Sequence, residues 1–115
     1  MGLDRDLART EIPPGTLYML ILRSLARLGP MHGYGIVQHI QLLSEDVLQV
    51  EEGSLYPALQ RMLIKGWVTS EWRQTENNRR ARYYRLTVAG KKQLTAEVSE
   101  FEKVMRAIAN VLQPT

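Results

Sequence analysis

Apolar residues recur three and four positions apart in several stretches of the chain, a spacing that places them on one side of an α-helix. The first such stretch, residues 17–28, follows a Pro-Gly-Thr start and ends at a Gly-Pro pair. The stripe on its core side consists of Leu17, Leu20, Ile21, Leu25 and Leu28. Tyr18, Met19 and Leu22 widen this stripe beyond what one core face needs. The excess predicts a second buried face, against a partner chain.

Before this helix, residues 3–12 are mixed and amphipathic and predict a loose helix. After it, a second helix is expected from Met31 to about Leu43, and residues 47–50 alternate enough for a short strand. Its core positions are Ile36, Val37, Ile40 and Leu43.

A third helix follows Glu51-Glu52 and stops at Gly66, as helices commonly do at glycine. Pro57 has no amide hydrogen and is expected in the first helical turn, with Ser54 or the acidic pair as the cap. The apolar side is formed by Leu55, Leu59, Met62 and Leu63, and the outer side by Ser54, Tyr56, Pro57, Gln60 and Arg61. Such an outer side suits the reading of base edges in a major groove, although an ordinary helix with a solvated face has the same pattern.

Two strands rich in β-forming residues come next, over 67–73 and 82–86. The polar loop 74–81 joins them, and Asn77-Asn78 tolerate the positive φ of a hairpin turn. The alternation of the second strand directs Tyr84 and Leu86 to the core and leaves Arg82 at the loop end, free to reach outward.

Thr87 is expected to cap a last helix that runs from about Val88 to Leu112. Its apolar residues form a heptad seam of Leu94, Val98, Phe101, Met105, Ile108 and Leu112, thickened by Val104 and Val111. One face of a helix within the same chain would give this pattern as well. Because the helix is longer than so small a core can cover, a partner chain is the favoured interpretation.

The chain has 115 residues and a net charge of +3, which is unevenly distributed. Between Arg61 and Lys92 nine basic residues face only two acidic ones, a net charge of +7, so the remainder carries −4. A basic segment on an acidic body favours a polyanionic partner.

Several kinds of protein are disfavoured by what the sequence lacks. It has no cysteine, and its two histidines do not supply the ligands of a closed metal site, so neither metal nor cofactor is expected. No signal peptide or membrane-spanning segment is visible, so a cytoplasmic protein is expected. Gly33 and Gly35 do not complete a dinucleotide motif, because position 38 is Gln38. Ser54 lacks the context of a catalytic serine, so an enzyme is not expected.

Two helices, a short strand, a third helix and a hairpin with a basic loop form the winged helix-turn-helix arrangement, which is mainly α with a small β hairpin. The sequence resembles PadR-family transcriptional regulators of the short form with one C-terminal helix. The matching motifs are Gly15-Thr16-Leu17, His32-Gly33-Tyr34-Gly35-Ile36, Gly53-Ser54-Leu55-Tyr56-Pro57-Ala58-Leu59, Lys65-Gly66-Trp67-Val68, and Arg82-Tyr83-Tyr84-Arg85-Leu86-Thr87 with Gly90.

The resemblance implies a dimeric repressor that binds double-stranded DNA at a palindromic operator. Residues 1–87 would form the DNA-binding domain and residues 88–115 the dimerisation helix. The expected DNA-binding residues are Ser54, Tyr56, Pro57, Gln60, Arg61, Lys65, Arg79, Arg80, Arg82 and Tyr83. The expected dimer interface, between the last helix and the first helix of the partner, comprises Leu17, Met19, Leu94, Val98, Phe101, Met105, Ile108 and Leu112.

Some members of the family release DNA when phenolic acids or lipophilic cations bind near the dimer interface, so a small-molecule effector is expected there. Relatives often carry a tryptophan in the middle of the C-terminal helix, where this chain has Phe101. A winged helix that only binds other proteins would share the fold. It would have little reason to concentrate positive charge on the third helix and the hairpin. For the hairpin arginines, a polar loop that is merely solvated is the less favoured alternative.

Overall fold

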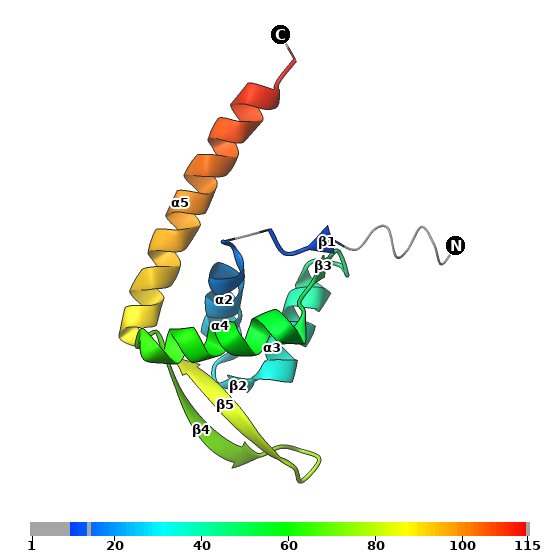
Figure 1. The fold of residues 1–115 in the computed structure, drawn as a ribbon, viewed down its shortest axis with the longest axis vertical. Helices are drawn as coiled ribbons and strands as arrows, with labels where there is room; N and C mark the ends of the chain where they lie inside the picture. Colours follow the sequence, from blue (N-terminus) through cyan, green and yellow to red (C-terminus); the bar gives the residue numbers. More distant parts are fainter. Residues whose placement is uncertain (1–9, 14, 115) are drawn as a thin grey trace, which may run out of the picture.

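The computed structural model describes residues 10–13 and 15–114, which form three packed helices, a small sheet and a long projecting helix (Figure 1). The elements are β1 (Thr10–Glu11), α2 (Leu17–Leu28), β2 (Met31–His32), α3 (Gly33–Leu43), β3 (Leu48–Gln49), α4 (Glu52–Ile64), β4 (Val68–Gln74), β5 (Arg80–Leu86) and α5 (Val88–Leu112). The strands β4 and β5 form the hairpin, called the wing. This arrangement confirms the predicted fold, mainly helical with a small β hairpin.

The core lies where α2, α3, α4, the base of the wing and the start of α5 meet. Its buried apolar residues are Met19, Ile21, Leu22, Leu25, Ile36, Ile40, Leu55, Ala58, Leu59, Met62, Val68, Tyr84 and Leu94. The apolar sides predicted for the second and third helices therefore face this core, with one exception. Leu43, at the end of α3, is 53% exposed.

The buried side of α2 differs from the prediction. Met19 and Leu22, expected to face a partner chain, belong to the core of the single chain, whereas Leu28 is exposed at the end of the helix. The helix is rotated relative to the expected stripe because its core contacts come from α5 and β5 as well as from α3 and α4. The surplus of apolar residues is thus partly used within one chain.

Two short strand pairs were not predicted. Met31 and His32 pair with Tyr84 and Tyr83, so the sheet has three strands in the order β2-β5-β4 and α3 begins only at Gly33. The Nδ1 atom of His32 accepts a hydrogen bond of 3.0 Å from the amide of Gly35 and thereby caps α3.

The second pair joins β1 and β3 in parallel, with Thr10 opposite Leu48. Residues 10–11 are therefore extended and not part of a loose helix, while the remainder of that predicted helix up to residue 9 lies outside the described residues. The short strand expected over residues 47–50 is confirmed at residues 48–49.

The helix α4 starts at the earlier of the two predicted caps, the acidic pair. Glu51 is the N-cap residue and makes no side-chain capping bond, so Ser54 is already inside the helix. Pro57 consequently lies beyond the first turn, and the carbonyl of Gly53 loses the usual helical bond from position 57.

The end of α4 is as predicted. Gly66 has a φ of 77° and donates its amide to the carbonyl of Leu63, while the amide of Trp67 donates to the carbonyl of Met62. This pair of bonds is a Schellman motif, which only a left-handed residue completes without strain. It turns the chain directly from α4 into the wing.

The wing follows the predicted alternation, and its second strand begins two residues earlier than predicted, at Arg80. Val68 lies opposite Leu86 and Ser70 opposite Tyr84, with Tyr84 buried in the core as expected. At the tip, Asn78 adopts a φ of 60°, which confirms the expected hairpin turn.

The last helix begins as predicted, and its first turn is locked against the wing. The Thr87 hydroxyl accepts a 3.0 Å bond from the amide of Gly90 and donates one of 2.7 Å to the carbonyl of Gly66. Gly90 is buried, and a Cβ atom there would collide with the carbonyl oxygen of Trp67 and the side chain of Leu86. Only glycine allows this close approach.

Replacing Gly90 by alanine is therefore expected to lower the free energy of unfolding by roughly 1–3 kcal/mol, the usual cost of overpacking. The matched control is Gly53→Ala, because nothing lies within 4 Å of the Cβ position of Gly53. That variant should gain about 0.5–1 kcal/mol, since alanine favours a helix interior more than glycine does. Urea denaturation at one fixed protein concentration measures both. Equal stability of the two variants would contradict the close approach.

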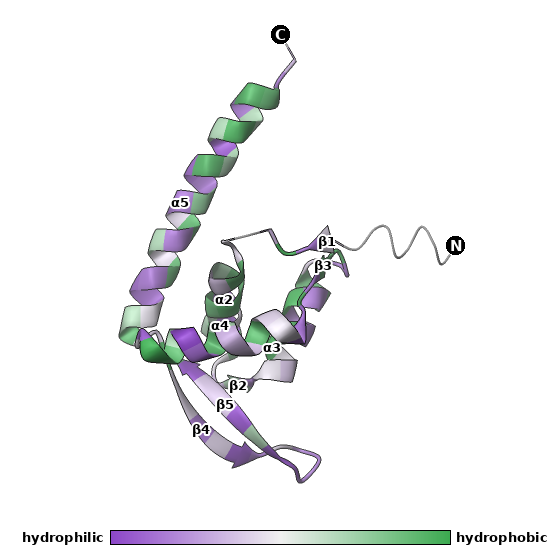
Figure 2. Cartoon of the chain, in the orientation of Figure 1, coloured by the Kyte–Doolittle hydropathy of each residue, from purple (hydrophilic) through white to green (hydrophobic). Residues whose placement is uncertain are grey.

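Beyond its first half, α5 leaves the body and points away from it (Figure 1). Hydrophobic and hydrophilic residues alternate along this free half (Figure 2). No helix in the described part of the chain is both long and apolar enough to cross a membrane.

Candidate nucleic-acid interface

The exposed side of α4 has a central ridge with few polar groups. Gly53, Pro57, Gln60 and Ile64 follow one another in steps of four, three and four, and all are exposed. Ile64 is 79% exposed. Gln60 is the only side chain of this ridge that can form hydrogen bonds, so it is the strongest candidate for reading a base.

Tyr56 lies on one flank of the ridge, beside the start of α3. Its ring and hydroxyl are 3.1 Å from the position that a Cβ atom of Gly33 would occupy, and half of its surface is exposed. The glycine thus makes room for Tyr56, which joins α4 to the N-terminal end of α3.

Ser54 and Arg61 lie on the opposite flank, facing the start of α2. The Nη1 atom of Arg61 donates a hydrogen bond of 3.2 Å to the hydroxyl of Tyr18. A groove of about 440 Å³ separates α2 from α4 here, and both Ser54 and Leu17 line it. Arg61 was predicted to face DNA, but it is already held by the first helix.

Lys65 is placed by the same cluster. The ring of Tyr18 meets that of Trp67 edge-on, with 5.7 Å between their centroids, and the Nζ atom of Lys65 lies 5.2 Å above Trp67. The cations Arg61 and Lys65 therefore occupy the second half of α4, whereas Glu51 and Glu52 stand at its start, where the helix dipole favours carboxylates.

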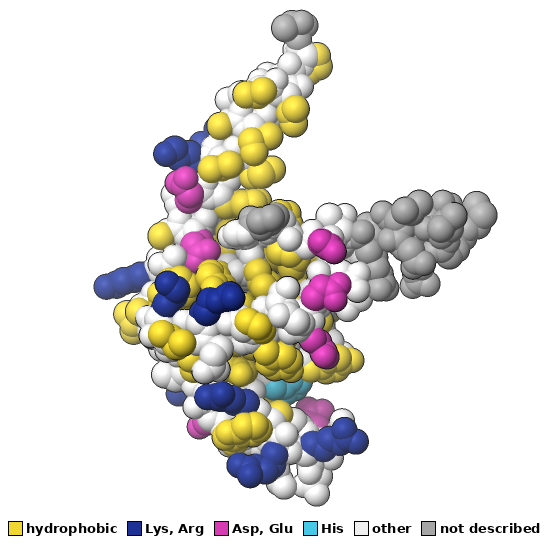
Figure 3. Space-filling model, in the orientation of Figure 1, with side chains coloured by type: hydrophobic (Ala, Val, Ile, Leu, Met, Phe, Trp, Pro, Cys, Tyr) yellow, Lys and Arg dark blue, Asp and Glu magenta, His cyan; other side chains and the backbone are white. Residues whose placement is uncertain are grey.

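The wing places its predicted residues on different faces. Arg80 and Arg82 share the face that continues the core, and Tyr83 points to the opposite face, where its ring meets that of His32 at 5.2 Å. Arg79 belongs to the tip, where its backbone amide donates to the Thr75 hydroxyl. Figure 3 shows the Lys and Arg side chains gathered over the wing and beside α4.

Arg82 is not at the loop end, as predicted, but inside β5 and half-buried. Its Nε atom donates a 2.8 Å hydrogen bond to the hydroxyl of Ser70, and its guanidinium lies 5.9 Å from the ring of Tyr84. Burial raises the pKa of Tyr84, while Arg82 acts in the opposite direction. Arg82 therefore helps to hold the wing together.

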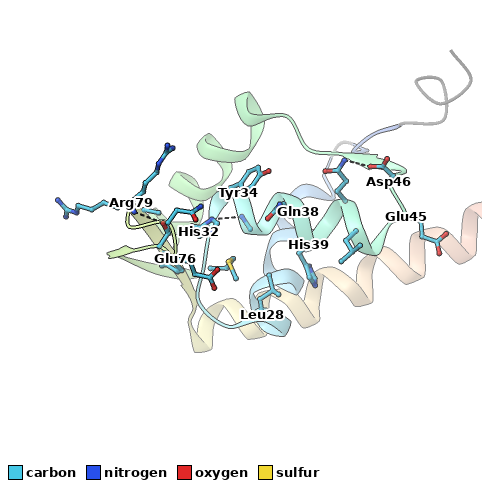
Figure 4. A pocket seen from close by; sticks show the side chains of 18 residues that line it. Leu28, His32, Tyr34, Gln38, His39, Glu45, Asp46, Glu76 and Arg79 are labelled. Atoms are coloured by element: carbon cyan, nitrogen blue, oxygen red, sulfur yellow. Dashed lines mark hydrogen bonds between the residues drawn. The ribbon is translucent and has the colours of Figure 1, made fainter. Parts of the chain in front are cut away.

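A broad groove of about 1230 Å³ runs between α3 and the wing (Figure 4). Arg79 and Arg80 line its wing end, and Glu45 and Asp46 line its far end. The two carboxylates disfavour a polyanion there. A DNA strand is thus expected on the α4 side of the wing and not along the whole of this groove.

The candidate dimer surface divides into a buried and an exposed part. Leu94 and Met19 are buried within the single chain, which corrects the expectation that they face a partner. Val98 and Leu17 are half-buried. The remaining seam residues are exposed, namely Phe101 (38%), Met105 (46%), Ile108 (44%) and Leu112 (76%).

Two exposed aromatic residues, one on α3 and one on the wing, were not among the residues predicted from the sequence. Tyr34 on α3 is 63% exposed, and Trp72 on β4 is 60% exposed. The period-two alternation of the hairpin could have placed Trp72 on the same face as Arg82, because the two residues lie directly opposite each other. No sequence pattern around Tyr34 predicts that it is exposed, because its exposure depends on how α3 packs beside α4.

A helix with an exposed ridge, a cationic wing beside it and a long helix with an unpaired apolar seam define a winged helix-turn-helix protein. Residues 21–96 match the family described as "Transcriptional regulator PadR-like family". The chain therefore belongs to the PadR-like family of transcriptional regulators, which confirms the resemblance predicted from its sequence. It is a regulator and not an enzyme.

Similar solved structures agree with this assignment. A transcriptional regulator from Clostridium thermocellum is 27% identical, with a TM-score of 0.78 over 86% of this chain and 95% of that one. A PadR-like transcriptional regulator from Bacillus cereus is 25% identical, with a TM-score of 0.73 over 88% and 95% of the two chains. An uncharacterised protein from Lysinibacillus sphaericus is 29% identical over 102 residues, which cover 89% of this chain and 93% of that protein.

Proposed function

We propose that the protein is a repressor that binds a palindromic DNA operator as a homodimer, with α4 in the major groove and the wing on the neighbouring sugar-phosphate backbone. The observation that carries this proposal is the position of the positive charge. Arg61 lies in the second half of α4, Lys65 follows its last residue, and Arg79 and Arg80 stand at the wing end of the α3 groove, whereas Glu45 and Asp46 lie at the far end of that groove. Such an arrangement attracts a duplex to one side of the molecule.

The proposed division of roles follows from the side chains. Gln60 on the ridge would read a base edge, and Tyr56 and Ser54 on the flanks would contact the edges of the groove. Arg79 and Arg80, which have no carboxylate partner among the described residues, would bind phosphates. Arg61 would reach DNA only after leaving the Tyr18 hydroxyl.

Homodimerisation is supported by the free half of α5. An isolated helix with its apolar seam in water is marginally stable, because most of the stability of a helix comes from packing of that face. A second copy of the chain offers the complementary seam, and a two-fold axis would present two copies of α4 to one duplex. Figure 3 shows hydrophobic side chains along the projecting part of α5.

A small aromatic or lipophilic effector is proposed at the dimer interface. The groove between α2 and α4 supports this idea, because Leu17 and Tyr18 on one wall belong to the helix that would meet the partner, while Ser54 and Arg61 on the other wall belong to the DNA-facing helix. An occupant of the groove would therefore contact both helices and could shift α4 relative to the dimer.

Gln60→Ala is expected to relax the base preference at one position of each half-site. A good bidentate contact contributes roughly 1–3 kcal/mol of discrimination, which is the amount that alanine should remove. In vitro selection of duplexes with the variant and the wild type measures the change, and Gln113→Ala, at the end of α5, is the control. If the selected motif of Gln60→Ala equals that of the wild type, Gln60 does not read a base.

A further inference from the structure

Beyond the base of the wing, where Arg85 is exposed on the outer face and has no ion pair among the described residues, the cations on the two faces are engaged differently. On the outer face, the Nε atom of Arg73 donates a 2.7 Å hydrogen bond to Glu71, and this bond lowers the pKa of the carboxyl group. The guanidinium of Arg73 also lies 5.0 Å from the ring of Tyr83. The charge of Arg73 is therefore neutralised by a neighbour on its own face.

The inner face, which continues the core outward, carries cations without such partners. Trp72 lies opposite Arg82, and Gln74 lies opposite Arg80. These four side chains are on the same face of the hairpin as Val68, which lies at its base. Among the described residues, neither Arg80 nor Arg82 forms an ion pair. Positive charge is thus available on the inner face.

Trp72 stands between these two cations and is largely uncovered. Its side chain is 60% exposed, and the guanidinium of Arg80 lies 5.4 Å from its ring. A single exposed apolar residue is ordinary on a protein surface. A tryptophan with an uncovered ring and an arginine on either side is a more specific arrangement, because it combines apolar area, an N–H donor and positive charge.

The inner face is also continuous with α4. Arg82 connects Trp72, which lies opposite it, to Tyr84, over whose ring its guanidinium lies, and β4 packs against α4. One stripe therefore runs from the exposed side of α4 through the base of the wing to its tip. On the wing it places the ring of Trp72 between Arg80 and Arg82, and Tyr84 is buried at its base.

From this stripe we infer that Trp72 is a DNA-contact residue, with its ring against a deoxyribose and its indole N–H directed to a phosphate oxygen beside the phosphate bound by Arg80. The inference rests on the proposed function, since it requires the duplex to lie against α4. A backbone contact of this kind positions the protein on DNA and carries no sequence preference. The partner of the stripe is the sugar-phosphate backbone of the operator duplex.

The protein offers a direct probe, because Trp67 and Trp72 are its only tryptophans. In the Trp67→Phe variant, the fluorescence reports Trp72 alone, and acrylamide quenching measures how accessible the ring is. Saturation with a duplex selected by the wild type is expected to reduce the quenching constant several-fold. In the matched Trp72→Phe variant, which reports the half-buried Trp67, the reduction should be much smaller.

Affinity provides the second measurement. Trp72→Ala is expected to weaken binding by about five- to tenfold, as for the loss of one hydrogen bond and one apolar contact. The loss should be equal for the selected duplex and an unrelated one, because the contact is with the backbone. Its melting temperature should remain close to that of the wild type, since most of the ring is already exposed in the single chain.

The outcomes separate the inference from the proposed function. If labelled DNA binds but the quenching of Trp72 is unchanged, Trp72 faces solvent in the complex and the inference fails while DNA binding stands. If Trp72 is already protected in the free protein, a protein surface covers it and the inference fails as well. If the wild type binds no duplex, the proposed function fails together with the inference.

Discussion

Placing glutamate at both Phe101 and Met105 is expected to separate the homodimer into single chains. The two side chains belong to the seam of α5 and are 38% and 46% exposed in the single chain. Fully burying such a side chain contributes roughly 1.5–3 kcal/mol, so the seams of two helices together can exceed the cost of association, which is about 4–15 kcal/mol. Two carboxylates in the same seam would lose their hydration without gaining a partner.

The matched control places two glutamates at exposed positions on the opposite side of the same helix, Ser99 and Asn110, and so adds the same charge. Sedimentation at micromolar concentration is expected to give a dimer for the wild type and the control, and a monomer for the seam variant. Because the core of each chain contains Leu94 but neither substituted residue, the monomer should keep its folded body. A monomeric wild type, or a dimeric seam variant, would show that α5 is not the interface.

The second large effect is expected from the wing tip. Replacing Arg79 and Arg80 by alanine in both chains removes four proposed phosphate contacts, which should reduce the slope of log K against log salt by about 3.6. Between about 50 and about 200 mM salt, the wild type should therefore lose roughly a hundredfold more affinity than the double variant. Arg82 is left in place, because it holds Ser70 and packs on Tyr84.

Arg73→Ala is the control for this prediction, because Arg73 is paired with Glu71 on the outer face of the wing. Its salt slope is expected to equal that of the wild type. Neither variant should change the selected base sequence, since phosphate contacts carry no sequence information. If the salt slope of the double variant equals that of the wild type, the wing tip is a solvated loop without contact to DNA.

Most of the fold could be predicted because its signals are local. Gly66 ends a helix, Thr87 begins one, and the heptad spacing after it fixes one long helix, all without knowledge of the surroundings. The hairpin followed from the same kind of signal, because alternation buried Tyr84 and the Asn77-Asn78 pair allowed the turn. These residues act through their immediate neighbours in the chain.

The features that escaped prediction depend on partners distant in sequence. The two-residue strand β2 forms because it can pair with the edge of β5, and two residues are too few to show a strand pattern in the sequence. Met19 is buried because α2 has several helical and strand neighbours, so its core side is wider than one stripe. Pro57 was wrongly assigned to the first turn of α4, because a helix tolerates the missing bond one turn later.

The candidate site shows the same division. The exposed position of Gln60, Tyr56 and Ser54 follows from helical periodicity and was predicted. The hydrogen bond between Arg61 and Tyr18 was not, because it joins two side chains that are 43 residues apart. Sequence patterns could therefore indicate which residues are exposed, but not which of them are already engaged by the rest of the protein.

In vitro selection of duplex DNA by the purified wild-type chain tests the central claim most directly, because it examines base recognition and dimer geometry together. Two copies of α4 related by a two-fold axis should enrich two inverted copies of one half-site, with their centres about one helical turn, or about 34 Å, apart. Enrichment of a single half-site, or of no sequence at all, would contradict the proposal that this protein binds an operator as a homodimer.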